Sequence, residues 1–239
     1  MVGLDAYSIP ARLAPALLVA MPVGLAIGVW FSQDMLGWGI GGGVTVGSLL
    51  FLVMAERARR AGKAVELRLE SELGARPTTV MLRHCDTRLE RPAKERYHRF
   101  LEGAVPGVKL PTPEAEEADP VNADEQYASC TRYLLEQTRD RKQHGLVFRE
   151  LVSYGFVRNL RGMRAAAIGS ALVGLLACGV RAILGLPESV HAVGAVGTIL
   201  SAFLLAMWWL KLNDQWVRDA SFDYARALLA SCDRINLTQ

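Results

Sequence analysis

The chain has 239 residues, a net charge of +3 and hydrophobic residues at 51% of its positions. The charged residues are segregated, because residues 55–164 hold 21 of the 27 Lys and Arg and 17 of the 24 Asp and Glu. Uncharged stretches on both sides of a charged middle argue against a single soluble domain and favour a membrane protein. The four cysteines form no Cys-x-x-Cys pair, which argues against a disulfide framework.

Four hydrophobic spans are predicted, two before the charged middle and two after it. Residues 13–31 and 35–55 form the first pair, and residues 165–186 and 190–210 form the second. Each approaches the ~20 residues that cross a ~30 Å hydrocarbon core. Pro22 lies inside the first span, where a proline removes a helix hydrogen bond and is expected to produce a kink.

The charged middle is predicted to be helical. Residues 56–73 continue the second span as a helix that ends at Gly74-Ala75-Arg76-Pro77, and further helices are expected at 91–101, 123–143 and 146–160. Four prolines and an acidic cluster mark residues 105–120 as a linker or ordered loop. The apolar positions of residues 216–235 repeat with heptad-like spacing, which predicts a last amphipathic helix.

The predicted fold class is therefore a mostly α membrane protein. Four transmembrane helices, arranged 2+2, flank a helical cytoplasmic domain, and a C-terminal amphipathic helix follows. The predicted domains are a cytoplasmic N-terminal segment (1–12), a hairpin of spans one and two (13–55), a cytoplasmic ligand-sensing domain (56–164), a hairpin of spans three and four (165–211) and the C-terminal helix (212–239).

The distribution of Lys and Arg predicts the orientation. The turns around Asp34 and Glu188 carry essentially no positive charge, whereas arginines lie next to the spans on the side of the middle domain. Under the positive-inside rule, both termini and the middle domain are cytoplasmic.

Small and charged residues within the spans leave two interpretations open. Gly39, Gly43 and Gly47 recur every fourth residue and line one helical face, which predicts either ordinary helix packing or a pore lining. Arg181 either reaches the outer headgroups or contributes to a ring of positive charge in a pore.

The middle domain is rich in arginine with aromatic residues interleaved. Arginine matches phosphate groups bidentately and stacks on bases, so these residues predict a site for a nucleotide or single-stranded nucleic acid. The alternative is a set of surface ion pairs, because 17 acidic residues lie in the same segment. The nominated ligand-binding residues are Arg76, Arg83, His84, Arg88, Arg96, Tyr97, Arg99, Arg139, Arg141 and Lys142.

An enzymatic role has weaker support. His84, Asp86 and His98 are the ligand-type cluster of the middle domain, yet no zinc, nucleophile-elbow or phosphate-loop motif accompanies them. We therefore expect no catalytic residues, no metal and no cofactor. A membrane-anchored enzyme that uses these three residues is kept as an alternative, as is a non-conducting scaffold that recruits a cytosolic partner through the acidic loop 114–119.

The junction before the third span is the most distinctive stretch. It places a glycine between two aromatic residues, directly ahead of an arginine and an asparagine. Two compatible roles are predicted: a bend that seats the domain, and a hinge that couples the domain to the spans. The nominated coupling residues are Tyr154, Gly155, Phe156, Arg158 and Asn159.

Several motifs carry a resemblance to a known family. They are LDAYSIPARLAP (4–15), PTT (77–79), LRH (82–84), RYH (96–98), LPT (110–112) and YGFVRNL (154–160). Over most of its length the chain resembles a widespread family of bacterial four-span proteins. Its layout is similar to the membrane effectors of nucleotide-driven antiphage defence, most closely the Hailong-type effector.

The resemblance implies a homo-oligomeric, tetrameric ion channel in the bacterial inner membrane. It also implies a partner nucleotidyltransferase that makes single-stranded DNA or a related product. That product would bind the cytoplasmic domain and hold the channel closed until phage activity removes it. No ligand residue is carried over from the family, so the basic residues above are nominated on charge alone.

Overall fold

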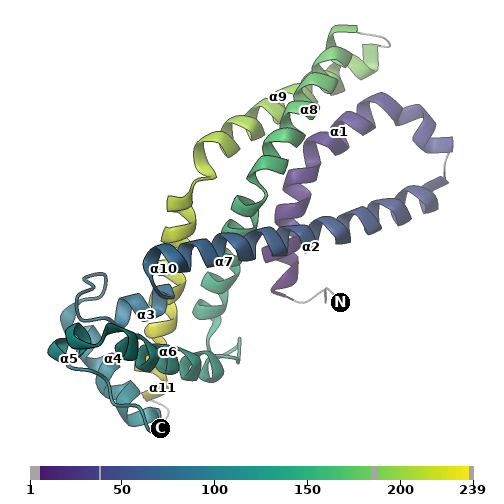
Figure 1. Cartoon of the computed structure of the whole chain (residues 1–239). Coiled ribbons are helices and arrows are strands. Elements are labelled where there is room, and N and C mark those ends of the chain that lie inside the picture. Colours follow the sequence, from purple (N-terminus) through teal and green to yellow (C-terminus); the bar gives the residue numbers. More distant parts are fainter. Residues whose placement is uncertain (1–5, 38, 185–187, 237–239) are drawn as a thin grey trace. The chain divides into compact units, whose positions relative to one another are not determined.

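The computed structural model describes residues 6–37, 39–184 and 188–236, and within them all side chains except those of 32–37, 39–52, 188–190 and 236. Every regular element in these ranges is a helix (Figure 1). The mostly helical fold class predicted from the sequence is therefore confirmed.

The chain divides into two compact units. Unit 1 comprises Met1–Glu66 and Gly155–Val217, and unit 2 comprises Leu67–Tyr154 and Arg218–Gln239. The boundaries fall inside three helices: α2 (Gly39–Leu73), α7 (Gly145–Gly162) and α10 (Asp214–Leu229). Residues 56–66 and 155–164, which we had grouped with the middle domain, belong to unit 1.

Unit 1 contains the apolar helices. They are α1 (Ala14–Gly37), preceded by the π-helical turn η1 (Ile9–Leu13), α8 (Arg164–Leu184) and α9 (Glu188–Lys211). Among the residues that the structure describes, three segments are long and apolar enough to cross a membrane, namely Ile9–Phe31, Arg164–Leu184 and His191–Lys211. They correspond to the first, third and fourth predicted spans. The second predicted span, residues 35–55, falls almost entirely on residues whose side chains are outside the described part.

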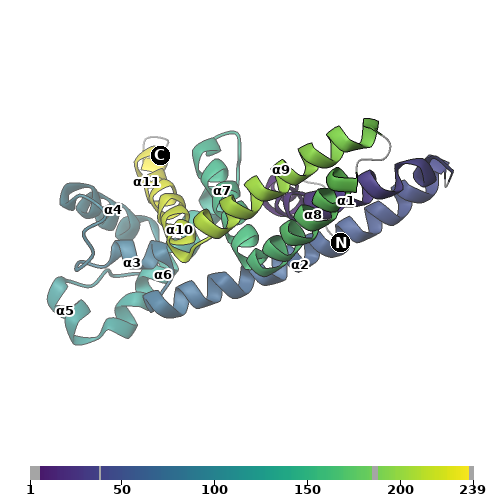
Figure 2. The same cartoon turned by 90° about the horizontal axis from the view of Figure 1, so that it is seen from above.

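The helices α1, α8 and α9 pack against one another, and α8 and α9 lie side by side in Figures 1 and 2. Small residues allow this approach. A Cβ atom at Gly174 of α8 would lie 2.6 Å from Cβ of Pro22 and 2.7 Å from Oγ of the fully buried Ser201. A Cβ at Gly197 of α9 would lie 2.8 Å from Sγ of Cys178. Glycine contacts of this kind dominate helix packing where lipid removes the hydrophobic driving force.

The predicted kink in α1 is displaced. The backbone of α1 departs from helical angles at Phe31 (φ −118°, ψ 20°). Phe31 lies nearer the C-terminal end of the helix than Pro22 does. The adjacent Trp30 donates its indole N–H to the carbonyl oxygen of Ala177 in α8 at 3.0 Å. This bond ties the end of α1 to α8.

Unit 2 is built from short helices around one core. They are α3 (Pro77–Leu82), α4 (Arg91–Ala104), α5 (Pro113–Ala118), α6 (Pro120–Gln137) and α11 (Ser231–Asn236), together with parts of α2, α7 and α10. Leu82, Leu101, Tyr127, Leu134 and Leu228 are fully buried in this core. Burial of each such side chain contributes about 1.5–3 kcal/mol, which makes this core the main source of stability in unit 2.

Two parts of unit 2 differ from the sequence prediction. Residues 105–120, expected to be a linker or loop, contain α5, whose first turn is capped by the Thr112 hydroxyl accepting from the Ala115 N–H. The single C-terminal helix expected at 216–235 is interrupted at Ala230 and forms α10 and α11. The predicted end of α2 is confirmed, and Gly74 there adopts φ 75°.

Candidate ligand site

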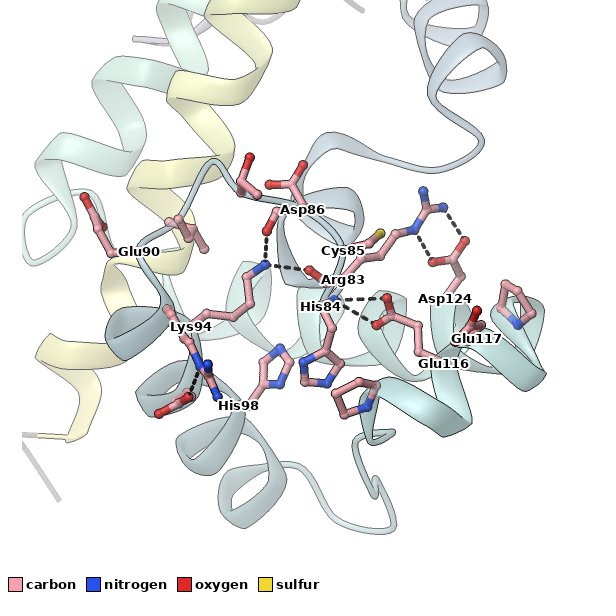
Figure 3. A pocket seen from close by; sticks show the side chains of 16 residues that line it. Arg83, His84, Cys85, Asp86, Glu90, Lys94, His98, Glu116, Glu117 and Asp124 are labelled. Carbon is pink, nitrogen blue, oxygen red and sulfur yellow. Dashed lines mark hydrogen bonds and ion pairs between the residues drawn. The ribbon is translucent and has the colours of Figure 1, made fainter.

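A cleft of about 1270 Å³ opens in unit 2 (Figure 3). Its walls are the loop at residues 83–90, the start of α4, and the helices α5 and α6. Two of the nominated ligand residues, Arg83 and His84, line it. The loop therefore decides what the cleft presents to a ligand.

Two buried charges fix this loop from opposite sides (Figure 3). The ammonium group of Lys94 donates to the main-chain oxygens of Arg83 and Asp86. The carboxylate of Glu116 accepts from the main-chain N–H of His84 at 2.9 and 3.0 Å and from the Tyr127 hydroxyl at 2.6 Å. A buried charge is tolerated when it is hydrogen-bonded in this way, so both side chains position the loop.

Burial affects the pKa of these two groups differently. It lowers the pKa of Lys94, whose ammonium form loses hydration. Burial alone would raise the pKa of Glu116, but the hydrogen bonds from Tyr127 and the His84 N–H outweigh it and lower that pKa. Neither role could be predicted from the sequence, because Lys94 is one of several basic residues there and Glu116 is one of an acidic cluster.

The histidines of the enzymatic alternative have structural partners. Nε2 of His84 lies 2.9 Å from the Pro111 carbonyl oxygen, and Nε2 of His98 lies 2.8 Å from that of Leu82. A carbonyl oxygen only accepts, so each Nε2 carries its proton. The third member, Asp86, bonds to Arg88. Within the described residues, no group of three or more His, Cys, Asp or Glu is placed to hold a metal ion.

The cleft carries an excess of negative charge. Its lining includes Arg83, Arg91 and Lys94, but also six carboxylates: Asp86, Glu90, Glu95, Glu116, Glu117 and Asp124. The guanidinium of Arg83 is itself engaged by Asp124 through two bonds of 2.8 and 2.6 Å. A polyanion entering this cleft would meet net repulsion. This cleft is therefore a poor phosphate site, although it contains two nominated residues.

Several other nominated arginines are also paired. Arg139 lies 2.8 Å from Glu136 and Arg76 lies 3.4 Å from Glu70. The guanidinium carbon of Arg88 lies 4.1 Å from the centroid of the Phe222 ring. For these residues the surface ion pairs that were the alternative interpretation are what the structure shows.

A second cavity, of about 380 Å³, contains two of the nominated arginines. It is lined by α4 and α11 residues: Arg96, Arg99, Phe100, Gly103, Ala104, Cys232 and Asp233. Nε and Nη2 of Arg96 lie 3.4 and 3.3 Å from the carboxylate of Asp233. No carboxylate among the described residues pairs with Arg99. Arginine is here in excess over carboxylate, in contrast to the large cleft.

Tyr97 lies behind this cavity and is buried. Its hydroxyl donates to Asp233 at 3.3 Å. Burial, with a further contribution from the charge of Asp233, raises the pKa of Tyr97 to about 12. The nominated Arg141 and Lys142 lie elsewhere, after α6, with the Arg141 guanidinium carbon 4.6 Å from the Phe148 ring centroid. Arg83 and His84 therefore line the cleft and Arg96 and Arg99 line the second cavity, whereas Arg141 and Lys142 line neither.

The junction residues do not form a bend. The helix α7 continues through Gly155, so that part of the prediction is wrong. Gly155 instead allows close approach, since a Cβ there would lie 2.6 Å from the Tyr7 hydroxyl. Tyr154 belongs to unit 2 and stacks on Tyr224, with 6.2 Å between the ring centroids. Phe156 belongs to unit 1 and packs on the core of that unit.

The end of α7 connects several parts of unit 1. The fully buried Asn159 donates its amide N–H to the main-chain oxygen of Ala11 at 2.6 Å. Its Oδ1 occupies the position that a Cβ on Gly62 of α2 would take, so a Cα–H of Gly62 points at this oxygen. Arg158 adds an ion pair of 2.8 Å with Glu66 of α2.

Of the nominated pore residues, only the side chain of Arg181 lies in the described part of the structure. Gly39, Gly43 and Gly47 lie on α2 but outside the part with described side chains. Arg181 is half-buried in α8, and its guanidinium carbon lies 5.4 Å from the centroid of the Trp30 ring. This distance is within the range of a cation–π contact, and it does not distinguish the two interpretations of Arg181.

Comparison of the chain with known protein families, with curated proteins and with solved structures found no match in any of the three. The fold therefore defines the class of protein: the described residues form a helical protein with three apolar helices of membrane-spanning length and a second compact unit that contains the cleft and the smaller cavity.

Proposed function

We propose that the chain is one subunit of an oligomeric, channel-type membrane effector. Unit 1 lies in the membrane, and unit 2 lies in the cytoplasm and binds a nucleotide or single-stranded DNA that gates conduction. The observation that carries this proposal is the combination, in one chain, of membrane-length apolar helices and a distinct arginine-rich unit. A simple anchor needs one span, whereas several helices packed through glycines make a bundle that has alternative arrangements.

The pore of this channel is assembled from the second and fourth predicted spans, with Gly39, Gly43 and Gly47 on its helix contacts and Arg181 at its outer end. A tetramer, which the motif resemblance implies, gives each subunit the same place around a central axis. Unit 2 holds 17 Lys and Arg and 18 Asp and Glu, so its attraction for an anion depends on the local placement of arginine, which symmetric association repeats around the axis.

The junction at the end of α7 supports a coupling role. Asn159 joins the turn η1 to α7 and α2, and Arg158 adds a second link to α2. A displacement of α7 therefore changes the contacts of two other elements of unit 1. Coupling of this kind travels through packed side chains and hydrogen bonds that have discrete arrangements.

The biological setting of the proposal rests on the motif resemblance. In that setting the protein acts in antiphage defence at the bacterial inner membrane, with both termini in the cytoplasm. A nucleotidyltransferase partner supplies the ligand. An anionic product of such an enzyme can form charge-assisted hydrogen bonds with arginine side chains of unit 2.

Reconstitution tests the proposal. Full-length protein in liposomes is expected to conduct ions, and a short single-stranded oligothymidylate is expected to change the flux, while protein-free liposomes show neither effect. Absence of flux both with and without the oligonucleotide rejects the channel. A turnover lost in His98→Ala would favour the membrane-anchored enzyme, and a monomer in a stable 1:1 complex with a cytosolic protein would favour the scaffold.

A further inference from the structure

The smaller cavity of unit 2 has the arrangement of a phosphate site. Along α4, Arg96, Phe100 and Gly103 follow at spacings of four and three residues, so they share one helical face with Arg99 beside them. The opposite wall is α11, which contributes Cys232 and Asp233. A volume of about 380 Å³ lies within the range of small-ligand pockets.

The charges distinguish this cavity from the large cleft. Two guanidinium groups face one carboxylate here, whereas carboxylates exceed cations in the cleft. The Arg96–Asp233 contacts of 3.3 and 3.4 Å are longer than the 2.6 and 2.8 Å of the Arg83–Asp124 pair. Strong charge-assisted bonds of arginine have lengths of ~2.7–2.9 Å, so Arg96 is held loosely.

We propose that this cavity binds the phosphate group of a nucleotide, with Arg96 and Arg99 as donors. Asp233 acts as an internal competitor, which occupies Arg96 in the free protein and is displaced by the ligand. The inference rests on the proposed function, because that function requires a phosphate-bearing ligand. Arg96 and Arg99 are the residues that would bind this ligand. Phosphate presents three acceptor oxygens to two planar forks, a better match than one carboxylate.

The competitor assignment gives a prediction with a definite sign. Asp233→Asn keeps an oxygen that accepts from the Tyr97 hydroxyl but removes the negative charge that repels phosphate. Phosphate affinity is therefore expected to increase about threefold or more. A merely structural role for Asp233 predicts unchanged or reduced affinity instead.

Gly103 offers a second, independent variant. No atom lies within 4 Å of a Cβ placed there, so a side chain at this position extends into open space. Gly103→Glu is expected to fill the cavity and to repel phosphate without removing either arginine, whereas Gly103→Ala leaves room and is expected to bind normally. Gly103 lies at the end of α4 and its φ is not positive, so Ala can adopt the same backbone conformation and the control is expected to fold.

The experiment measures binding to full-length protein in nanodiscs. The probes are a fluorescent oligothymidylate, AMP and inorganic phosphate, the last two as competitors. We expect Arg99→Gln and Gly103→Glu to weaken probe binding about tenfold or more, the scale for loss of a charged hydrogen bond. Arg91→Gln is the matched control, since this exposed arginine lies on the same helix and pairs with Glu95 at 2.9 Å.

The outcomes separate the location from the function. If wild-type protein binds the probe but Arg99→Gln and Asp233→Asn match wild type, or if Arg91→Gln alone loses binding, the site lies elsewhere and this inference is overturned. If wild-type protein binds none of the three probes, the proposed function fails with it. Competition by AMP that exceeds competition by inorganic phosphate identifies a nucleotide; equal competition identifies free phosphate and overturns the nucleotide assignment. Thermal unfolding of each variant confirms that the fold is retained.

Discussion

Lys94 and Glu116 show how single buried charges set the geometry of unit 2. Lys94 satisfies two carbonyl groups of the loop, and Glu116 satisfies the N–H of His84 on the other side. The sequence does not reveal this pair, because contacts across a fold leave no periodic signal. The basic residues could be identified from the sequence, but the carboxylate that pairs with each arginine could not. This pairing determines which arginines are available to bind a phosphate.

Glu116 gives a testable pH dependence. Its pKa in the folded protein is below the ordinary value of 4.5. The stabilisation is therefore fully present above pH 4.5 and is lost as the pH falls through the lower folded value. We expect Glu116→Gln to lower stability near neutral pH by about 1–3 kcal/mol and to flatten the acid dependence.

The measurement is thermal unfolding of the detergent-solubilised protein as a function of pH. Glu117→Gln is the control, because Glu117 is the exposed neighbour of Glu116. Equal acid profiles for wild type and Glu116→Gln would show that this carboxylate does not stabilise the loop.

At the scale of elements, hydrophobic periodicity and stop signals located most helices. The end of α2 at Gly74 and the start of α4 at Arg91 agree with the sequence. The helix α5 was missed because six residues are too few for a periodic pattern, and its start depends on a cap from Thr112. The role of Gly155 could not be predicted, because a glycine inside a helix can allow either a bend or a close contact. The neighbouring Tyr7, which only the structure shows, indicates a close contact.

The contact between α2 and α7 depends on two glycines. A Cβ at Gly162 would lie 2.5 Å from the carbonyl carbon of Ala61 and 2.7 Å from the nitrogen of Gly62. Main-chain atoms cannot move aside, so Gly162→Ala is expected to destabilise unit 1 by about 1–3 kcal/mol, the usual cost of overpacking.

Gly169→Ala in α8 is the matched control, because no atom lies within 4 Å of a Cβ there. Unfolding temperatures in detergent compare the two variants. Equal values would mean that α2 and α7 do not approach as closely as described.

At the scale of the whole molecule, three of the described helices are long and apolar enough to cross a membrane and lie in unit 1, whereas most of the charged residues lie in unit 2. Composition alone predicted this separation, since charges and spans segregate along the sequence. Composition did not predict the limits of the units, which fall inside α2, α7 and α10. A helix that serves two units has no break in its pattern to mark the boundary.

The proposed function requires that unit 2 faces the cytoplasm, and chemical labelling of Cys85 tests this orientation. Cys85 is exposed, whereas burial raises the pKa of Cys130 to about 11 and of Cys232 to about 12 and keeps both thiols unreactive. Cys178 is buried within the span α8. A membrane-impermeant maleimide is the probe, applied to inside-out and right-side-out membrane vesicles, with Cys85→Ser as control. We predict labelling of wild type in inside-out vesicles alone; labelling from the outer face, or recovery of the protein in the soluble fraction, would contradict the account.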